Sequence, residues 1–298
     1  MSLLAPERDR LAKSSDEVRR TIDIVWSAYR SVLSKEGKLA YVSTAITSGL
    51  RMYEVLDTLG LRSADELKEK HPAVLFDQVI RPNIEAGNEV AKVLAAKEDR
   101  PVVAPAIFEA KKQRWSQDEY MAMWLGMIEE NVGAMFMSPG WEYSNGGAEE
   151  FLHAIQMALG FKSRWDIEIL DHERKPITVH AGLISIGQAL RALHARGRKA
   201  PILADVFRSV VAVARVSLVE LVRNPKVSNA YFCAMDRDVV RSTAQEHAKF
   251  ISDEYGIVVP GPFDVKIGEG IPRLNDATPE GIVLKAQDAP DAPKESDQ

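Results

Sequence analysis

The sequence contains a single cysteine, Cys233, among 298 residues. One cysteine excludes an internal disulfide and a cysteine-based metal cluster, and it suits a reducing compartment such as the cytoplasm. The six histidines never occur in an H-x-x-x-H pair, which argues against a zinc site. We therefore expect no metal and no cofactor, and we interpret Cys233 as a buried structural thiol.

Acidic and basic residues are present in similar numbers, 43 and 38. A net charge of -5 and a pI near 5.8 give no electrostatic case for nucleic acid as a partner. The first ten residues have no apolar signal core, so secretion is not expected. The most apolar long run, Ala200 to Val222, carries four charged residues, too many for a membrane span. These absences predict a cytoplasmic protein with no membrane partner.

Three common catalytic and phosphate-binding motifs are missing. The chain has no G-x-S-x-G elbow, no G-x-x-x-x-G-K phosphate loop and no G-x-G-x-x-G fingerprint. Its 46% hydrophobic and 27% charged residues are typical of a globular protein, and its length allows one large domain or two small ones. The remaining candidate for chemistry is a carboxylate.

Short apolar strands alternate with helices in the first part of the chain. The expected strands are 39–45, 101–106, 133–137 and 166–170. Helices are expected near 15–36 and 82–97, and after capping boxes that begin at Ser63 and Ser116. This alternation predicts an α/β fold with a doubly wound parallel sheet, in which ligands lie beyond the carboxyl ends of the strands.

The chain changes character after Leu170. Three helices are expected at 181–196, 201–223 and 237–255, with a strand at 229–235. We predict four regions: an N-terminal helical segment (1–38), an α/β core (39–170), a mainly helical extension (171–285) and a disordered tail (286–298).

The stretch from Ser138 to Glu150, S-P-G-W-E-Y-S-N-G-G-A-E-E, joins the third expected strand to a helix expected at 148–159. Proline and glycine end the strand. Gly146 and Gly147 allow the backbone to approach a ligand closely, and the free N–H groups of a helix start can hold an anion or a sugar hydroxyl. This turn is the best candidate for a binding site.

Two adjacent acids open that helix, and helical phase separates them. Glu149 shares a polar stripe with His153 and Gln156, which indicates the solvent face. Glu150 lies instead on the apolar stripe with Ala154. Glu150 either complements the helix dipole or serves a site, and its position alone favours neither.

Hydroxyl side chains follow the first strand, where they would lie beside this stretch. Ser43 and Thr44 either bind a ligand hydroxyl or phosphate or cap a helix. Tyr41, within the strand, either positions a ligand or belongs to the core. A stripe on the 116–130 helix that includes Met123 and Trp124 is interpreted as core rather than cofactor contact.

The chain resembles the nucleoside 2-deoxyribosyltransferase superfamily, particularly its DUF4406-like branch. Residues 139–150 are similar to the family's P-G-W-x-x-S-x-G-A-x-x-E turn. Residues 41–49 match its first strand and turn, 83–105 its next helix and strand, and Trp115 with Tyr120 and Met121 its W-x-x-x-x-Y-M helix. The resemblance covers about 39–161.

The resemblance implies a flavodoxin-like core in which Glu150 attacks the anomeric carbon of a nucleoside or nucleotide. Ser144, where the transferases have aspartate, favours hydrolysis of a 5′-monophosphate over transfer. The substrate-binding residues that it implies are Tyr41, Ser43, Thr44, Trp141, Ser144, Asn145, Gly146 and Gly147. It also implies a homo-oligomer, with the extra helices as the interface.

Two departures from the family pattern keep another function open. The family aspartate at the start of the third strand aligns with Gly133, so Glu129, Glu130 or Asn131 would have to replace it. The first turn reads T-A-I-T where glycine-proline is usual. The alternative is a non-catalytic nucleotide-binding or assembly protein with the same fold.

Overall fold

The computed structural model describes residues 11, 14–33, 38–108, 115–158, 167–221 and 237–259. All of them belong to one unit, Met1–Asp264. The predictions for Cys233, for a strand at 229–235 and for a disordered tail at 286–298 lie outside the described residues.

Four strands form a single sheet in which every pair is parallel. They are β1 (Leu39–Ser43), β2 (Val102–Val103), β3 (Val132–Met137) and β4 (Glu168–Asp171). The order β2-β1-β3-β4 places β1 and β3 in the centre, where the chain's direction of travel across the sheet reverses. The predicted parallel α/β sheet is confirmed, and its order is that of a flavodoxin-like fold.

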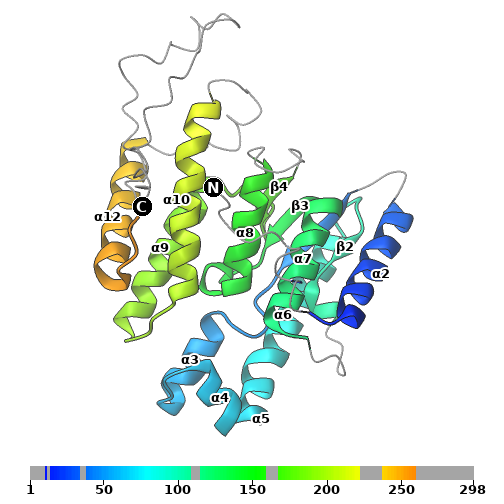
Figure 1. The fold of residues 1–298 in the computed structure, drawn as a ribbon, viewed down its shortest axis with the longest axis horizontal. Coiled ribbons are helices and arrows are strands. Elements are labelled where there is room, and N and C mark those ends of the chain that lie inside the picture. The colour runs from blue at the N-terminus through cyan, green and yellow to red at the C-terminus, as the bar shows by residue number, and fades with distance from the viewer. Residues whose placement is uncertain are drawn as a thin grey trace, which may run out of the picture. The chain divides into compact units, whose positions relative to one another are not determined.

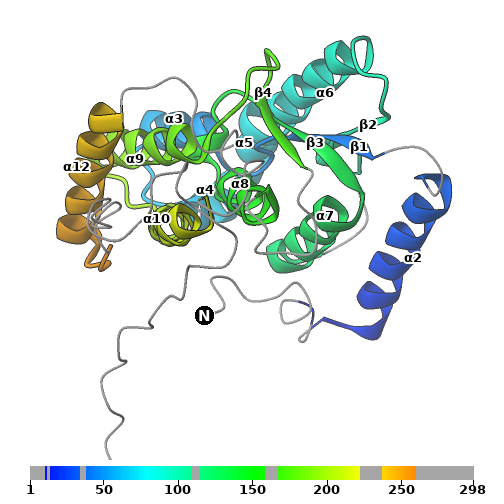
Figure 2. The same ribbon diagram turned by 90° about the horizontal axis from the view of Figure 1, so that it is seen from above.

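Helices cover both faces of the sheet (Figure 2). One face packs α6 (Arg81–Ala95) over residues such as Ala40 and Val42. The other packs α7 (Gln117–Asn131) and α8 (Asn145–Ala158) over residues such as Tyr41 and Met135. Because both faces are covered, every residue of β1 and β3 is buried, as expected for their unbroken apolar runs.

The capping patterns produce the predicted helix starts. Ser116 and Glu119 form a reciprocal capping box at the start of α7, and Ser63 caps α4 (Ala64–Lys70). The first described helix, α2 (Asp16–Leu33), lies outside the sheet layers and packs on α7, where the Trp26 indole donates to the Met123 carbonyl. This placement agrees with the predicted N-terminal helix.

The segment between β1 and β2 contains more helix than the sequence predicts. The helix α3 (Leu50–Leu59) was not expected. The helix predicted at 82–97 is confirmed as α6, with Pro82 in its first turn, but α5 (Pro72–Leu75) and a π-helical turn η2 (Phe76–Ile80) precede it without a break. Proline cannot donate the usual helical hydrogen bond, and a wider turn just before it accommodates that loss.

Three long helices follow β4, as predicted (Figure 1). They are α9 (Val179–Ala195), α10 (Pro201–Leu221) and α12 (Arg237–Tyr255). Both α9 and α10 contact α8, and α12 contacts α9. They therefore add a helical layer on the side of α8 away from α7. No helix in the described part of the chain is long and apolar enough to cross a membrane.

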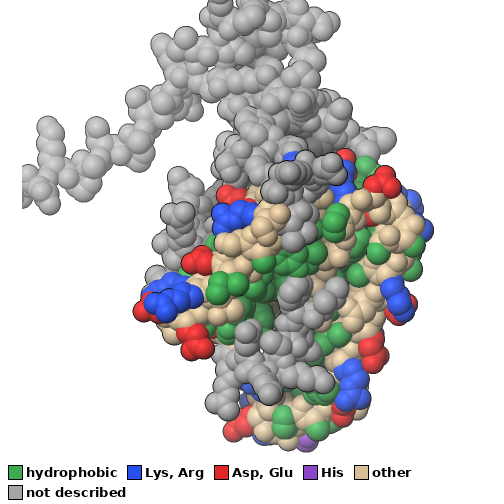
Figure 3. Space-filling model, turned by 90° about the vertical axis from the view of Figure 1, so that its right-hand side faces the viewer, with side chains coloured by type: hydrophobic (Ala, Val, Ile, Leu, Met, Phe, Trp, Pro, Cys, Tyr) green, Lys and Arg blue, Asp and Glu red, His purple; other side chains and the backbone are tan. Residues whose placement is uncertain are grey.

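The surface shown in Figure 3 carries acidic and basic side chains interspersed among apolar ones. The described side chains on this face form no cluster of positive charge.

Candidate active site

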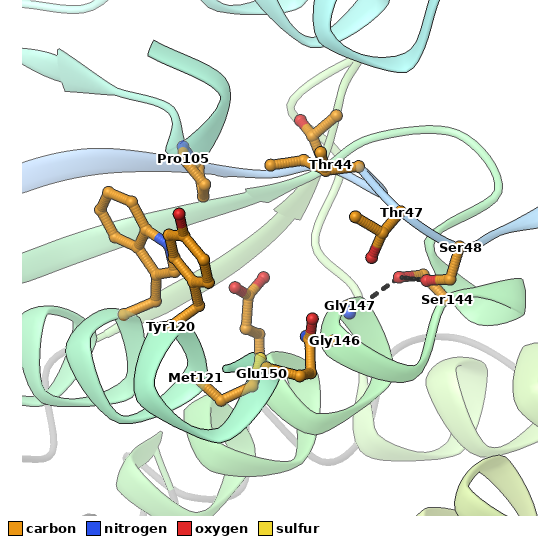
Figure 4. Close-up of a pocket in the computed structure, with 13 residues that line it drawn as sticks. Thr44, Thr47, Ser48, Pro105, Tyr120, Met121, Ser144, Gly146, Gly147 and Glu150 are labelled. Atoms are coloured by element: carbon orange, nitrogen blue, oxygen red, sulfur yellow. Dashed lines mark hydrogen bonds between the residues drawn. The ribbon is translucent and has the colours of Figure 1, made fainter. Parts of the chain in front are cut away.

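A cavity of about 130 Å³ lies at the carboxyl ends of β1 and β3 (Figure 4). The loop after β1 forms one wall, and the turn between β3 and α8, which includes the 3₁₀ turn η4 (Trp141–Tyr143), forms another. The Thr44 and Ser138 hydroxyl oxygens lie 3.1 Å apart, and those of Ser48 and Ser144 lie 3.0 Å apart. The two segments that the sequence singles out are therefore neighbours, as the parallel sheet predicts.

Thirteen residues line this cavity, and they come from four parts of the chain. They are Thr44, Ile46, Thr47, Ser48, Pro105, Gln117, Tyr120, Met121, Trp124, Ser144, Gly146, Gly147 and Glu150.

Glu150 is the acid at the centre of the cavity, and only 5% of it is exposed. The Tyr41 hydroxyl donates a 2.6 Å hydrogen bond to its Oε1, and the Ser43 hydroxyl donates one of 2.6 Å to its Oε2. Both donors stand on β1, two residues apart, and therefore point to the same face of the strand. Of the two explanations for this acid, the structure therefore favours a role in a site over interaction with the helix dipole, because two side chains of the sheet bind its carboxylate.

Burial raises the pKa of Glu150 from its ordinary value of 4.5 to about 7. The hydrogen bonds from Ser43 and Tyr41 oppose this rise in pKa, because they favour the charged carboxylate, and the nearby Glu149 adds to it. Desolvation is the largest of these effects. A pKa raised toward neutral pH suits a group that does chemistry near pH 7.

The helix that carries Glu150 begins earlier than predicted. It starts at Asn145 rather than Ala148, because the Ser144 hydroxyl accepts a 3.3 Å hydrogen bond from the Gly147 N–H and caps it. Both glycines thus lie in the first helical turn. A Cβ atom on Gly147 would sit 2.9 Å from the Trp141 carbonyl oxygen, so this glycine serves close packing of the protein's own backbone.

The polar stripe that begins at Glu149 does not face solvent, and that prediction is wrong. His153 and Gln156 are only 1% and 6% exposed. The reason is that α7 covers one side of α8 while α10 covers another, and His153 Nε2 lies 3.6 Å from the Glu129 carboxylate. Ala154 on the Glu150 stripe is buried as predicted. The helix α8 is therefore buried on two faces, of which helical periodicity predicted only one.

The structure brings most of the predicted site residues together. Thr44, Ser144, Gly146 and Gly147 line the cavity, while Tyr41 and Ser43 act on it through Glu150. Neither Ser43 nor Thr44 caps α3, whose start at Gly49 has no side-chain cap.

Besides Tyr41 and Ser43, two other predicted substrate-binding residues do not line the cavity. Trp141 is buried against the Phe151 ring, with the ring centroids 4.7 Å apart. Asn145 is half-buried at the start of α8. Trp141 and Asn145 therefore belong to the turn and the first residue of α8, and not to the cavity wall.

Sequence reasoning missed the wall that α7 supplies. Gln117, Tyr120, Met121 and Trp124 all line the cavity. Trp124 is also buried against Tyr41, with ring centroids 6.0 Å apart, so the core assignment was correct but incomplete. The available signal was the i, i+3, i+7 spacing of Gln117, Tyr120 and Trp124, which places an amide and two aromatic rings on one face of the helix.

The position aligned with the family aspartate lies away from this cavity. Gly133 stands near the amino end of β3, where a Cβ atom would lie 2.6 Å from the Lys38 Cβ. Of the suggested replacements, Glu129 lies beside His153, Glu130 pairs with Arg30, and Asn131 donates to a methionine sulfur. None of them lines the cavity.

The ionisable groups of the cavity wall are few. Among the described lining residues, Glu150 is the only carboxylate, and no lysine, arginine or histidine is present. In the same part of the chain, no group of three or more histidine, cysteine, aspartate or glutamate residues is placed to hold a metal ion. Glu150, Tyr120 and the hydroxyl side chains are thus the groups with which the wall can act on a ligand.

No family model matches the chain, and neither a curated protein nor a solved structure matches it.

Proposed function

We propose that this protein cleaves the N-glycosidic bond of a nucleoside 5′-monophosphate, with Glu150 as the nucleophile. The observation that carries the proposal is the buried Glu150 carboxylate, which two hydroxyl donors fix in a cavity at the carboxyl ends of the strands. Its pKa of about 7 leaves a reactive ionised fraction at neutral pH. The resemblance of residues 139–150 to a family that uses a glutamate in this way supports the same assignment.

The order of groups along the cavity supports a nucleotide as the ligand (Figure 4). Tyr120 and Pro105 lie at one end, Ser48 and Ser144 at the other, and Glu150 lies between them. A nucleotide likewise has a flat base at one end, a sugar in the middle and a phosphate at the other end. Aromatic rings stack on bases, and hydroxyls with the first amides of a helix bind phosphate oxygens.

The proposed reaction has two displacements. Ionised Glu150 attacks the anomeric carbon as the C–N bond breaks, and the bonding electron pair leaves with the base, which takes up a proton. Because no other carboxylic acid lines the described cavity wall, that proton comes from water or from the Tyr120 hydroxyl. Water then attacks the glycosyl ester, which releases the sugar phosphate and restores the carboxylate. An acceptor base in place of water gives transfer.

The test is incubation with a panel of ribonucleoside and deoxyribonucleoside monophosphates, with free base measured by chromatography. Glu150→Gln keeps the size of the side chain but cannot attack the sugar, so base release should disappear. Glu149→Gln is the matched control, because Glu149 does not line the cavity, and it should retain base release. Release that persists in Glu150→Gln contradicts the proposal. A second base added to the mixture separates transfer from hydrolysis.

A second candidate is a non-catalytic nucleotide-binding or assembly protein. The observation that favours it is the absence of a second carboxylic acid or a histidine from the described cavity wall, which leaves base departure without a strong proton donor. This candidate predicts nucleotide binding in calorimetry with no release of base under any acceptor condition. Either candidate includes the expected homo-oligomer, which analytical ultracentrifugation tests.

A further inference from the structure

The loop after β1, residues 44–49 and here called the cavity loop, is held from outside the cavity by one side chain. Asn83, on α6, donates from Nδ2 to the Ile46 carbonyl at 3.0 Å and to the Ser48 carbonyl at 3.3 Å. These two acceptors flank Thr47, and all three of those loop residues line the cavity. One amide group therefore fixes the part of the loop that faces the ligand.

The orientation of this amide is itself determined. Arg51 Nε donates to the Asn83 Oδ1 at 3.2 Å, which turns Nδ2 toward the loop carbonyls. One helical turn further along α6, a Cβ atom on Gly87 would lie 2.7 Å from the Thr44 Cγ2. The α6 surface thus fits closely on the cavity loop at two successive turns.

The loop is also held from its other side, but by groups of a different kind. The Thr44 and Ser48 hydroxyls pair with those of Ser138 and Ser144. A phosphate at the Ser48 end of the cavity would compete for some of these hydroxyls. The Asn83 amide donates instead to backbone carbonyls of the loop. A phosphate cannot take its place there, because a phosphate oxygen and a carbonyl oxygen are both hydrogen-bond acceptors. Asn83 therefore keeps the loop in place when a ligand takes over the hydroxyls.

From these contacts we infer that Asn83 is a positioning residue that sets the preference for a 5′-phosphorylated substrate. Asn83 does not line the cavity, and it acts through the Ile46 and Ser48 carbonyls, which flank Thr47. The inference rests on the proposed function for its substrate class. The contacts that hold the loop do not depend on that function.

The first test compares Asn83→Asp with Asn88→Asp. Aspartate at position 83 keeps the acceptor for Arg51 but replaces both donors with an oxygen that repels the loop carbonyls. Asn88 is exposed on the same helix, so its substitution makes the same change of charge without touching the loop. The ratio of kcat/KM for a monophosphate to that for the unphosphorylated nucleoside should fall about tenfold in Asn83→Asp, through KM. It should not change in Asn88→Asp.

The second test needs no activity. Backbone hydrogen exchange of residues 44–49 in the ligand-free protein should be about tenfold faster in Asn83→Asp and unchanged in Asn88→Asp. If wild-type protein releases no base, the proposed reaction fails, and the phosphate preference is measured as a ratio of binding affinities instead. Unchanged exchange in Asn83→Asp, or a wild-type protein that does not prefer the phosphorylated ligand, overturns the inference.

Discussion

Two ionisable side chains are buried to nearly the same degree in different layers of the molecule. Glu150 on α8 is 5% exposed, and His247 on α12 is 4% exposed. Both oxygens of Glu150 accept hydrogen bonds from hydroxyl groups. Both ring nitrogens of His247 are buried without a hydrogen-bond partner.

Their surroundings explain the difference. The His247 ring lies against Gly187 of α9, whose added Cβ would be 2.5 Å from the His247 Cγ, and edge-on to Phe207 of α10 at 6.5 Å. Burial is the largest effect on both groups, and it raises the pKa of Glu150 and lowers that of His247. Both shifts favour the neutral form. Only Glu150 has donors that can hold its charged form and a cavity that can admit a ligand, so burial alone does not identify a site.

The largest expected effect separates the two residues by activity. Glu150→Gln should lower base release on the order of 10³-fold or more, because it removes the nucleophile. His247→Leu should leave base release within about twofold, because its ring lies in the helical layer and not in the cavity wall. Turnover of the preferred monophosphate at pH 8 measures both. Comparable losses of base release in Glu150→Gln and His247→Leu would contradict the view that only Glu150 belongs to a catalytic site.

The next effect appears in stability. Between its unfolded pKa near 4.5 and its folded pKa of about 7, Glu150 binds its proton more tightly in the folded state. The free energy of unfolding of the wild type therefore falls as pH rises through this window. The loss, which is the cost of ionising the buried Glu150, is complete above about pH 7. Glu150→Gln removes it and should be more stable than wild type by about 3 kcal/mol at pH 8, with most of that gain absent at pH 5.

Urea unfolding at the two pH values measures this gain. Glu149→Gln is the control, because it makes the same change of charge at the neighbouring, only half-buried position and should show no comparable gain. Equal stability of Glu150→Gln and wild type at pH 8 would mean that the folded protein does not penalise the Glu150 charge.

Features set by nearby residues were predictable from the sequence. The capping box predicted at Ser116 forms, since it depends on residues three apart. Of the box predicted at Ser63, only the Ser63 cap forms, because Glu66 accepts from the Arg62 N–H instead. The unbroken apolar run of β3 gave a strand buried on both faces. The proximity of Ser43 to the 138–150 stretch followed from the rule that ligand sites lie at the carboxyl ends of parallel strands.

Features set by packing between distant segments were not predictable. The stripe containing His153 looked exposed because nothing near it in sequence indicates that α7 and α10 cover it. The Trp124 ring was assigned to the core, but a single face of a helix can face both the core and a cavity. The hydroxyl donors to Glu150 come from more than 100 residues away, and only the fold reveals that Tyr41 and Ser43 reach it.

A smaller effect tests the donors that distinguish Glu150 from His247. Tyr41→Phe removes the hydrogen bond to Oε1 and should raise the pKa of Glu150 further, because that bond favours the charged form. The acid limb of the pH–rate profile should move to higher pH, with about tenfold less activity at pH 7 and recovery as the pH rises. Ser43→Ala should act in the same direction. An acid limb that does not move in either variant would contradict the role of these donors.

The smallest effect concerns the histidine. Because the pKa of His247 is lowered in the folded state, the unfolded chain binds more protons just below the ordinary value of 6.5, and stability falls as pH drops through that region. The neighbouring Arg191 also lowers this pKa, and Glu246 opposes the shift. His247→Leu should remove this acid sensitivity and stabilise the protein by about 1 kcal/mol at pH 7, because leucine leaves no buried nitrogen without a partner.

The measurement for His247→Leu is urea unfolding at pH 7 and pH 5, with His172→Gln on the exposed hairpin after β4 as the control. If His247→Leu is instead less stable than wild type at pH 7, the ring makes interactions that leucine cannot replace. The buried histidine would then stabilise the helical layer. Only the presence of a cavity would still distinguish Glu150 from His247.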